Sequence, residues 1–153
     1  MQVRAATTRD LDRVAALSSR LFAQHRGPGF ALAPGREAEL RELITGLVGD
    51  RRCALLVAED EAGGLLGFVL ASLLSRPGPF AESERGEIDW LFVREDDRRH
   101  GVGRALAGAA LDWLREHGAR RSLVHVERGN AAGRAFWDAQ GFSVVMDVLE
   151  RPL

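Results

Sequence analysis

The stretch of sequence that decides the fold, residues 87–104, reads Glu-Ile-Asp-Trp-Leu-Phe-Val-Arg-Glu-Asp-Asp-Arg-Arg-His-Gly-Val-Gly-Arg. Its first part, residues 88–93, is an apolar, aromatic and β-branched run, which is typical of a strand. Residues 94–100 are charged and interrupt this run. From Val102 onward, apolar residues recur at helical spacing. The stretch therefore predicts a strand, a loop and a helix in succession.

The loop before this helix has the features of an anion site. No Ser, Thr, Asp or Asn caps the helix, so its first backbone N–H groups have no acceptor nearby in the sequence. Gly101 and Gly103 allow a ligand to approach the backbone closely, and Arg98, Arg99 and Arg104 add positive charge. Because the N-terminus of a helix favours negative charge, we expect this loop to bind an anion such as phosphate.

Outward from this stretch, hydrophobic periodicity predicts an α/β fold in the order strand, helix, helix, strand, strand, strand, helix, strand, helix, strand. Strands are expected at residues 2–6, 53–58, 65–74, 88–93, 122–126 and 142–149, and helices at residues 10–22, 37–47, 102–117 and 131–139. A polar turn between the second and third strands predicts an antiparallel hairpin. The strands on either side of the helix at 102–117 should be parallel neighbours in a mixed sheet. We expect residues 1–153 to form one domain.

Composition excludes several classes of function. A net charge of −1 argues against nucleic-acid binding, and the absence of lysine excludes a phosphate loop that ends in Gly-Lys-Ser/Thr. Cys53 is the only cysteine and no Cys/His cluster has zinc-ligand spacing, so we expect neither an internal disulfide nor a metal. No segment has the pattern of a signal peptide or the length of a membrane span. These features predict a cytoplasmic protein with no membrane partner.

Three segments together resemble the GNAT superfamily of acyl-CoA-dependent N-acyltransferases. Arg98-x-x-Gly101-x-Gly103 matches the Arg/Gln-x-x-Gly-x-Gly/Ala motif of that superfamily, and the strand at 88–93 precedes it at the expected distance. The C-terminal half is similar as well, in Val124-x-Val126 followed by Asn130, Phe136 and Gly141-Phe142. A dinucleotide fingerprint is the competing interpretation of the glycines, but its third glycine would fall at Leu106.

This resemblance implies that acetyl-CoA is the acyl donor. The backbone amides of the loop would hold the pyrophosphate, and a bulged middle of the strand, residues 91–93, would hold the thioester carbonyl and stabilise an oxyanion. The residues implied in cofactor binding are Leu91, Phe92, Val93, Arg98, Arg99, His100, Gly101, Val102, Gly103, Arg104, Asn130, Arg134 and Trp137.

Glu87 and Asp89 are the candidate catalytic bases. They lie two residues apart on one strand and should therefore face the same side. Two neighbouring carboxylates raise one another's pKa, which suits a general base. A solvated polar face is the alternative explanation. His125, expected to be a packed or hydrogen-bonded strand histidine, and Glu127, expected to be a surface carboxylate, are weaker candidates.

Two features depart from the superfamily pattern. Trp137 stands where the superfamily usually carries the tyrosine assigned as the acid that protonates the departing thiolate, and an indole N–H cannot fill that role. Only eleven residues follow Gly141-Phe142, so the usual closing pair of strands is shortened. We expect a second subunit to complete this edge, which would make the protein a homodimer.

The expected function is transfer of an acetyl group from acetyl-CoA to a primary amine of a small molecule or peptide. Attack should be direct, since Cys53 lies outside every motif. The acceptor would enter between the loops at 24–36 and 76–86, where Glu82, Glu84, Glu87 and Asp89 would favour a cation. A non-catalytic acyl-CoA-binding sensor, suggested by Trp137, and a protein N-terminal or lysine acetyltransferase are the alternatives.

Overall fold

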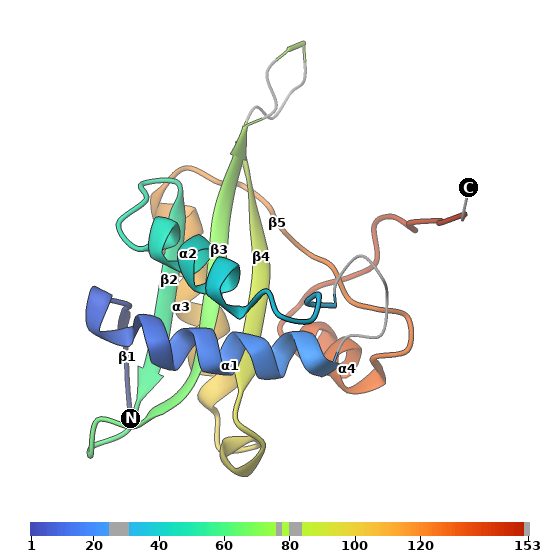
Figure 1. Ribbon diagram of the computed structural model, residues 1–153. Coiled ribbons are helices and arrows are strands. Elements are labelled where there is room, and N and C mark those ends of the chain that lie inside the picture. Colours follow the sequence, from blue (N-terminus) through green and yellow to red (C-terminus); the bar gives the residue numbers. More distant parts are fainter. Residues whose placement is uncertain (25–30, 76–77, 80–83, 152–153) are drawn as a thin grey trace.

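The computed structural model describes residues 1–24, 31–75, 78–79 and 84–151. Within these residues, a five-stranded sheet has the strand order β1-β2-β3-β4-β5 (Figure 1). The strands are β1 (Gln2–Ala5), β2 (Cys53–Glu59), β3 (Leu65–Ser75), β4 (Glu84–Val93) and β5 (Ser122–Val124). The helices are α1 (Leu11–Gln24), α2 (Glu37–Leu47), α3 (Val102–Glu116) and α4 (Ala131–Ala139), with 3-10 turns η1 (Thr8–Asp10) and η2 (Glu95–Asp97).

The pairing of the strands confirms the expected mixed sheet. β1 to β4 pair antiparallel in sequence order, and β5 pairs parallel to β4. Both the hairpin of β2 and β3 and the parallel neighbours on either side of α3 were therefore predicted correctly. α1 and α2 cover one face of the sheet, and α3 covers the other (Figure 1).

Alternating side chains of the sheet divide between two cores. Phe68 and Leu70 of β3 pack beneath α1 and α2, whereas Val69 and Ala71 pack beneath α3. α3 contributes a stripe of apolar residues at helical spacing, as its sequence predicts. The buried members of this stripe are Val102, Leu106, Ala107, Ala110 and Leu114. The sheet is thus held from both sides, and the end of α3 that begins at Val102 is fixed against it.

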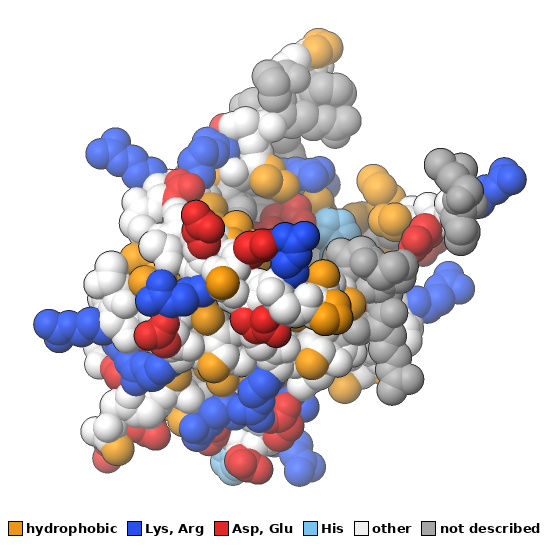
Figure 2. All heavy atoms as spheres, in the orientation of Figure 1, with side chains coloured by type: hydrophobic (Ala, Val, Ile, Leu, Met, Phe, Trp, Pro, Cys, Tyr) orange, Lys and Arg blue, Asp and Glu red, His pale blue; other side chains and the backbone are white. Residues whose placement is uncertain are grey.

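The expected strand at residues 142–149 is wrong. Residues 142–151 form neither helix nor strand, and the preceding strand ends at Val124 rather than Val126. The apolar side chains of this C-terminal arm are 56% to 93% exposed, namely Val144, Val145, Met146, Val148 and Leu149. Figure 2 shows such hydrophobic atoms along the arm. An apolar run becomes a strand only where a neighbouring edge pairs with it, and β5 offers an edge of three residues. The homodimer stays a prediction.

Some expectations fall outside the described residues. Half of the residues in the two loops between which the acceptor was expected to enter lie outside the described residues, and so does Glu82. Among the helices that are described, none is both long enough and apolar enough to cross a membrane.

Asp10 is a buried carboxylate that ties the start of α1 to the sheet. It is 0% exposed and accepts hydrogen bonds from the Arg4 guanidinium at 2.8 Å, the Thr7 backbone amide at 2.9 Å and the Arg13 guanidinium at 2.5 Å. Arg4 also donates to Glu59 of β2 at 2.9 Å. The hydrogen bond from Arg4, which outweighs the opposing effect of burial, holds the pKa of Asp10 well below its usual range.

Replacing Asp10 with asparagine should lower the free energy of unfolding by about 2–3 kcal/mol, because charge-assisted hydrogen bonds are lost in a buried place. Since the pKa of Asp10 is depressed in the folded protein, its contribution is complete above the unfolded value near ~3.9 and is lost as the pH falls below it. Urea unfolding between pH 3 and 7 measures both effects. Asp12→Asn is the matched control, because Asp12 pairs with Arg41 at the surface and its side chain is 79% exposed.

Gly67 of β3 lies close to the backbone of β4. A Cβ at this position would lie 2.3 Å from the Phe92 carbonyl oxygen and 3.1 Å from Val93 Cα. Gly67→Ala should therefore lower the free energy of unfolding by about 1–3 kcal/mol, because β4 must shift. Gly108→Ala should raise it by about 0.5–1 kcal/mol, because Gly108 is helical and nothing lies within 4 Å of the added methyl group. Equal stability of the two variants in urea would contradict the register of β3 and β4.

Candidate active site

β4 and β5 separate after three paired residues. Their ladder ends at Ile88 opposite Val124, whereas β4 continues to Val93. A β-bulge lies at the same point, because Leu70 of β3 faces Trp90 and the next residue, Ala71, faces Ile88, which leaves Asp89 without a partner. The two strands therefore diverge beside Asp89. The bulge lies two residues earlier than the expected position at 91–93.

The bulge decides which backbone groups face the opening. Arg94 N–H donates to the Leu66 carbonyl of β3 at 2.9 Å. Because alternate residues of a strand point their backbone groups to the same edge, Leu91 and Val93 direct theirs away from β3 and toward the opening. The Val93 carbonyl accordingly accepts from Arg98 Nε at 3.1 Å on that side. An unpaired stretch of β4 backbone thus lines the opening.

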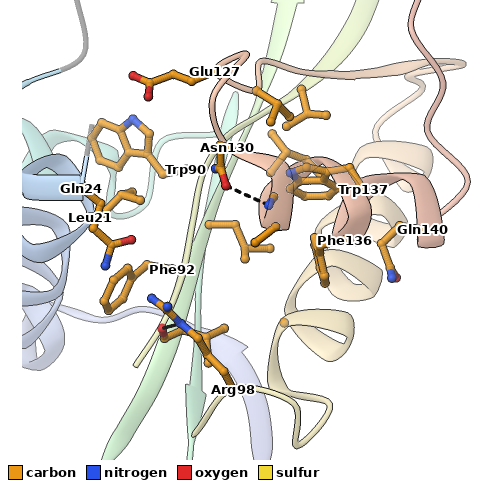
Figure 3. A pocket seen from close by; sticks show the side chains of 18 of the residues that line it. Leu21, Gln24, Trp90, Phe92, Arg98, Glu127, Asn130, Phe136, Trp137 and Gln140 are labelled. Atoms are coloured by element: carbon orange, nitrogen blue, oxygen red, sulfur yellow. Dashed lines mark hydrogen bonds between the residues drawn. The ribbon is translucent and has the colours of Figure 1, made fainter. Parts of the chain in front are cut away.

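A cleft of about 1210 Å³ lies between the diverging strands. One wall is β4 from Ile88 to Val93, and the opposite wall is formed by residues 124–127 and by α4 (Figure 3). The N-terminus of α3 lies at one end of the cleft. Leu21 and Gln24 of α1 border the β4 wall, as Figure 3 also shows.

The loop before α3 has the geometry that its sequence predicts. Gly101 is the N-cap of α3 with φ 83°, a left-handed conformation that favours glycine, and no side chain caps the helix. The first backbone amides of α3 therefore have no acceptor within the helix. Arg98 holds this loop against β4 through its bond to Val93 and also donates to Glu95 at 3.3 Å.

Glu95 connects this loop with α1. Its carboxylate accepts hydrogen bonds from Gln24 Nε2 at 3.1 Å and from Arg20, in addition to the one from Arg98. The guanidinium carbons of Arg20 and Arg98 lie 5.5 Å and 5.9 Å from the centre of the Phe92 ring. The end of α1, the loop before α3 and β4 are therefore joined at one corner of the cleft.

Asn130 lines the cleft and is the N-cap residue of α4. Its Oδ1 accepts from the Gly133 backbone amide at 2.8 Å, which is an N-cap hydrogen bond. A Cβ at position 133 would lie 2.5 Å from Asn130 Nδ2, so Asn130 in this orientation leaves no room for a side chain there. With Oδ1 used by the cap, Nδ2 is the group that Asn130 can offer to a ligand.

Trp137 packs in the core beside the cleft. It is 7% exposed and makes edge-to-face contacts with Phe136 at 4.9 Å and Phe142 at 5.1 Å between ring centres. The indole thus packs among aromatic side chains and supplies no ionisable proton donor at this position.

Asp89 and Glu87 have different surroundings. Ser72, which faces Glu87 across the β3–β4 pair, donates from Oγ to Asp89 Oδ2 at 2.5 Å, so the two carboxylates lie on the same face, as expected. Asp89 lines the cleft and is exposed to solvent on its open side. The protein atoms around its carboxyl still displace part of the water, which raises the pKa of Asp89; the hydrogen bond from Ser72 lowers this pKa and the charge of Glu87 raises it.

Glu87 does not line the cleft. Its side chain is 13% exposed, and its Oε1 lies 2.9 Å from Nδ1 of His125, the residue that follows β5. His125 is thus a hydrogen-bonded histidine, as expected, but it also lines the cleft, together with Glu127, which was expected at the surface.

The structure gathers most of the residues that the sequence singles out. Those that line the cleft are Asp89, Leu91, Phe92, Val93, Arg98, Arg99, Gly101, Gly103, Arg104, Asn130 and Trp137. His100 is exposed, Val102 is buried in the core, and Arg134 pairs with Asp138 at 3.0 Å; these three are not among the lining residues. Trp90 and Gln24 also line the cleft; the sequence placed them in the strand at 88–93 and the loop at 24–36 but assigned neither a role.

Comparison with known proteins agrees with this geometry. The profile of the acetyltransferase (GNAT) family matches residues 18–142. A mycothiol acetyltransferase of Propionibacterium freudenreichii is 33% identical over 136 residues, which is 89% of this chain and 41% of that protein. The chain thus spans about two fifths of the length of this relative.

Two further proteins are similar over more of their own length. An aminoglycoside N(6')-acetyltransferase type 1 of Klebsiella aerogenes is 33% identical over 116 residues, and 73% of each chain is covered. The solved structure of an aminoglycoside N-acetyltransferase in complex with CoA has the same fold, with a TM-score of 0.82 at 18% identity over 99% of this chain and 93% of that one. The chain therefore belongs to the GNAT family of acetyltransferases, which use acetyl-CoA as their acyl donor.

Proposed function

We propose that this cleft binds acetyl-CoA and that the protein transfers the acetyl group to a primary amine of a small molecule or peptide, with Asp89 as the base. The observation that carries the proposal is the position of Asp89 at the point where β4 and β5 diverge, beside the unpaired backbone of β4. A thioester held by this backbone would meet an amine held by Asp89.

The two ends of the cleft suit the two substrates. The end formed by the N-terminus of α3 carries Arg98, Arg99 and Arg104, and its free amides and positive charge favour the pyrophosphate of acetyl-CoA. The Leu91 amide points into the opening and would stabilise the oxyanion of the tetrahedral intermediate. The other part carries the carboxylates of Asp89 and Glu127, which favour a cationic amine.

The proton acceptor matters more than the missing proton donor. A primary amine with a pKa near ~10.4 must lose a proton before it attacks, which costs roughly 4.6 kcal/mol at pH 7. A thiolate whose thiol has a pKa near ~8.5 leaves unprotonated at a cost on the order of 2 kcal/mol. Asp89 therefore takes the first proton from the ammonium group, and the neutral amine then attacks to form the C–N bond. The C–S bond breaks to give a thiolate, and the second proton lost by the nitrogen passes to this thiolate through water.

Direct attack is favoured by the state of Cys53. Its Sγ lies 3.7 Å from Ser72 Oγ, and burial raises the pKa of the thiol, which disfavours the nucleophilic thiolate. Cys53 is also not among the residues that line the cleft. An acetyl-cysteine intermediate therefore has no support, and the amine itself is the nucleophile.

The test is release of free thiol from acetyl-CoA in the presence of a panel of amines that includes aminosugars, diamines and short peptides. Activity with a small amine supports the proposal. Acetylation of peptides alone would favour a protein acetyltransferase, and tight binding of acetyl-CoA without turnover would favour a sensor. Failure to bind acetyl-CoA at all would contradict every one of these functions.

Replacing Arg98 with alanine should weaken acetyl-CoA binding by roughly 10-fold to 100-fold, because a charged donor at the phosphate end is lost and the loop is released from β4. Isothermal titration calorimetry measures the dissociation constant. Arg115→Ala is the control, because Arg115 pairs with Asp112 at the surface of α3 and is 71% exposed. Equal affinities of the two variants would place the phosphates elsewhere.

Asp89→Asn should lower kcat/KM for the amine by about 10²-fold to 10⁴-fold while the affinity for acetyl-CoA changes little, because only the proton transfer is removed. Steady-state kinetics and calorimetry on the same preparation separate the two effects. Glu61→Gln, in the exposed turn between β2 and β3, removes one carboxylate away from the cleft and should leave kcat/KM unchanged. A loss smaller than tenfold for Asp89→Asn would remove it as the base.

A further inference from the structure

Four polar side chains meet where the strands diverge. Ser72 of β3 and Glu87 of β4 are opposite one another, Ser72 Oγ donates to Asp89 Oδ2 at 2.5 Å, and His125 Nδ1 lies 2.9 Å from Glu87 Oε1. Ser72, Glu87, Asp89 and His125, here called the carboxylate cluster, therefore link β3, β4 and the segment after β5. Only Asp89 and His125 of this cluster line the cleft.

We propose that Ser72, Glu87 and His125 are positioning residues that set the orientation and the proton affinity of Asp89, with Glu87 acting in the opposite sense to Ser72 and His125. This inference rests on the proposed role of Asp89 as the base. It assigns Glu87, a candidate base by sequence, to a supporting role, because its side chain is turned to His125 rather than into the cleft.

Ser72 orients the base. Its hydroxyl donates to Oδ2 of Asp89 and so ties the carboxylate to β3. A hydrogen bond to a carboxylate favours its charged form. Ser72 is itself fixed because it belongs to the central strand β3, which is paired on both sides. The hydrogen bond from Ser72 adds to one from the Asp89 backbone in holding this carboxylate.

Glu87 makes Asp89 a stronger base. A carboxylate on the same face disfavours a second negative charge, so Glu87 raises the pKa of Asp89. His125, whose side chain contacts Glu87, acts on the pKa of Asp89 in the opposite direction. His125 is 57% exposed and Glu87 is 13% exposed, so the histidine is also the member of the pair that solvent reaches.

The other ionisable groups in this region lie farther along the strands from Asp89. Cys53 on β2 touches Ser72, and Glu127 lines the cleft after His125. Arg52 and Glu84 pair with one another at 2.9 Å at the end of the β3–β4 hairpin. Among the described residues, Ser72 and Glu87 are thus the neighbours with the most direct influence on Asp89, and they act in opposite directions.

The test is the pH dependence of kcat/KM with one amine acceptor. Glu87→Gln removes a repulsive charge, so the pKa of Asp89 should fall and the acid limb should move to lower pH by roughly half to one unit. Ser72→Ala removes a hydrogen bond to the charged form, so the limb should move to higher pH by a similar amount. His125→Asn should also move the limb to higher pH. Ser72→Thr keeps the hydroxyl and should restore the wild-type limb.

Matched controls separate this effect from a general loss of structure. Ser19→Ala removes a hydroxyl that donates within α1 at 3.1 Å, Glu61→Gln removes a distant carboxylate, and His117→Asn removes a histidine at the end of α3. None should move the limb. A purely structural role of Ser72 or Glu87 would lower kcat at every pH without moving it.

A second measurement does not depend on turnover. Carbon-13 NMR titration of the Asp89 carboxyl in the free protein should show its pKa lowered in Glu87→Gln and raised in Ser72→Ala. Shifts in the same direction, or none in either variant, would overturn the inference whether or not the protein turns over. Opposite shifts in a protein that acetylates no amine would support the carboxylate cluster and would contradict the proposed function instead.

Discussion

The early end of the ladder between β4 and β5 is the constraint on which the site depends. A strand that loses its neighbour exposes unpaired backbone groups, and such groups need a partner. In this protein the unpaired edge of β4 lines a cleft, so a ligand can satisfy it. The bulge at Asp89 lies at the same point and directs the amides of Leu91 and Val93 to this edge. Without the bulge, the alternation of β4 would turn these amides toward β3.

The bulge also explains how one strand serves two cores and a site. Ile88 and Leu91 both pack on the α3 side of the sheet, although an unbroken strand would put them on opposite faces. Trp90 and Phe92 pack on the side of α1 and α2. Asp89, between the two patterns, belongs to neither core and is therefore available for chemistry.

The cleft is electrically polarised along its length. Arg98, Arg99 and Arg104 surround the end at α3, and the carboxylates of Asp89 and Glu127 lie toward the other part. This arrangement would orient a substrate pair of which one is an anion and the other a cation. The proposed reaction uses this charge distribution for both substrates. The phosphates of the donor are attracted to the arginines and the ammonium group of the acceptor to the carboxylates, which brings the thioester and the amine together.

The sequence alone determined the strand, the loop and the helix of residues 87–104, including the missing side-chain cap of that helix. These features depend on dihedral preferences and hydrogen bonds among neighbours in the sequence, which a local pattern records. Hydrophobic periodicity likewise predicted the strands and the apolar stripe of α3. Most of the residues that the family motif then indicated line the cleft, which further residues such as Trp90 and Gln24 line as well.

Only the tertiary structure decided where the bulge lies, which carboxylate faces the cleft and whether the last apolar run becomes a strand. Ser72 and Asp89 are 17 residues apart in the sequence, and they meet because the β3–β4 hairpin sets one register. Glu87 meets His125 only because β5 returns parallel to β4. Residues 142–149 have the composition of a strand but no available edge. Each of these outcomes depends on pairing between distant segments, which no local pattern encodes.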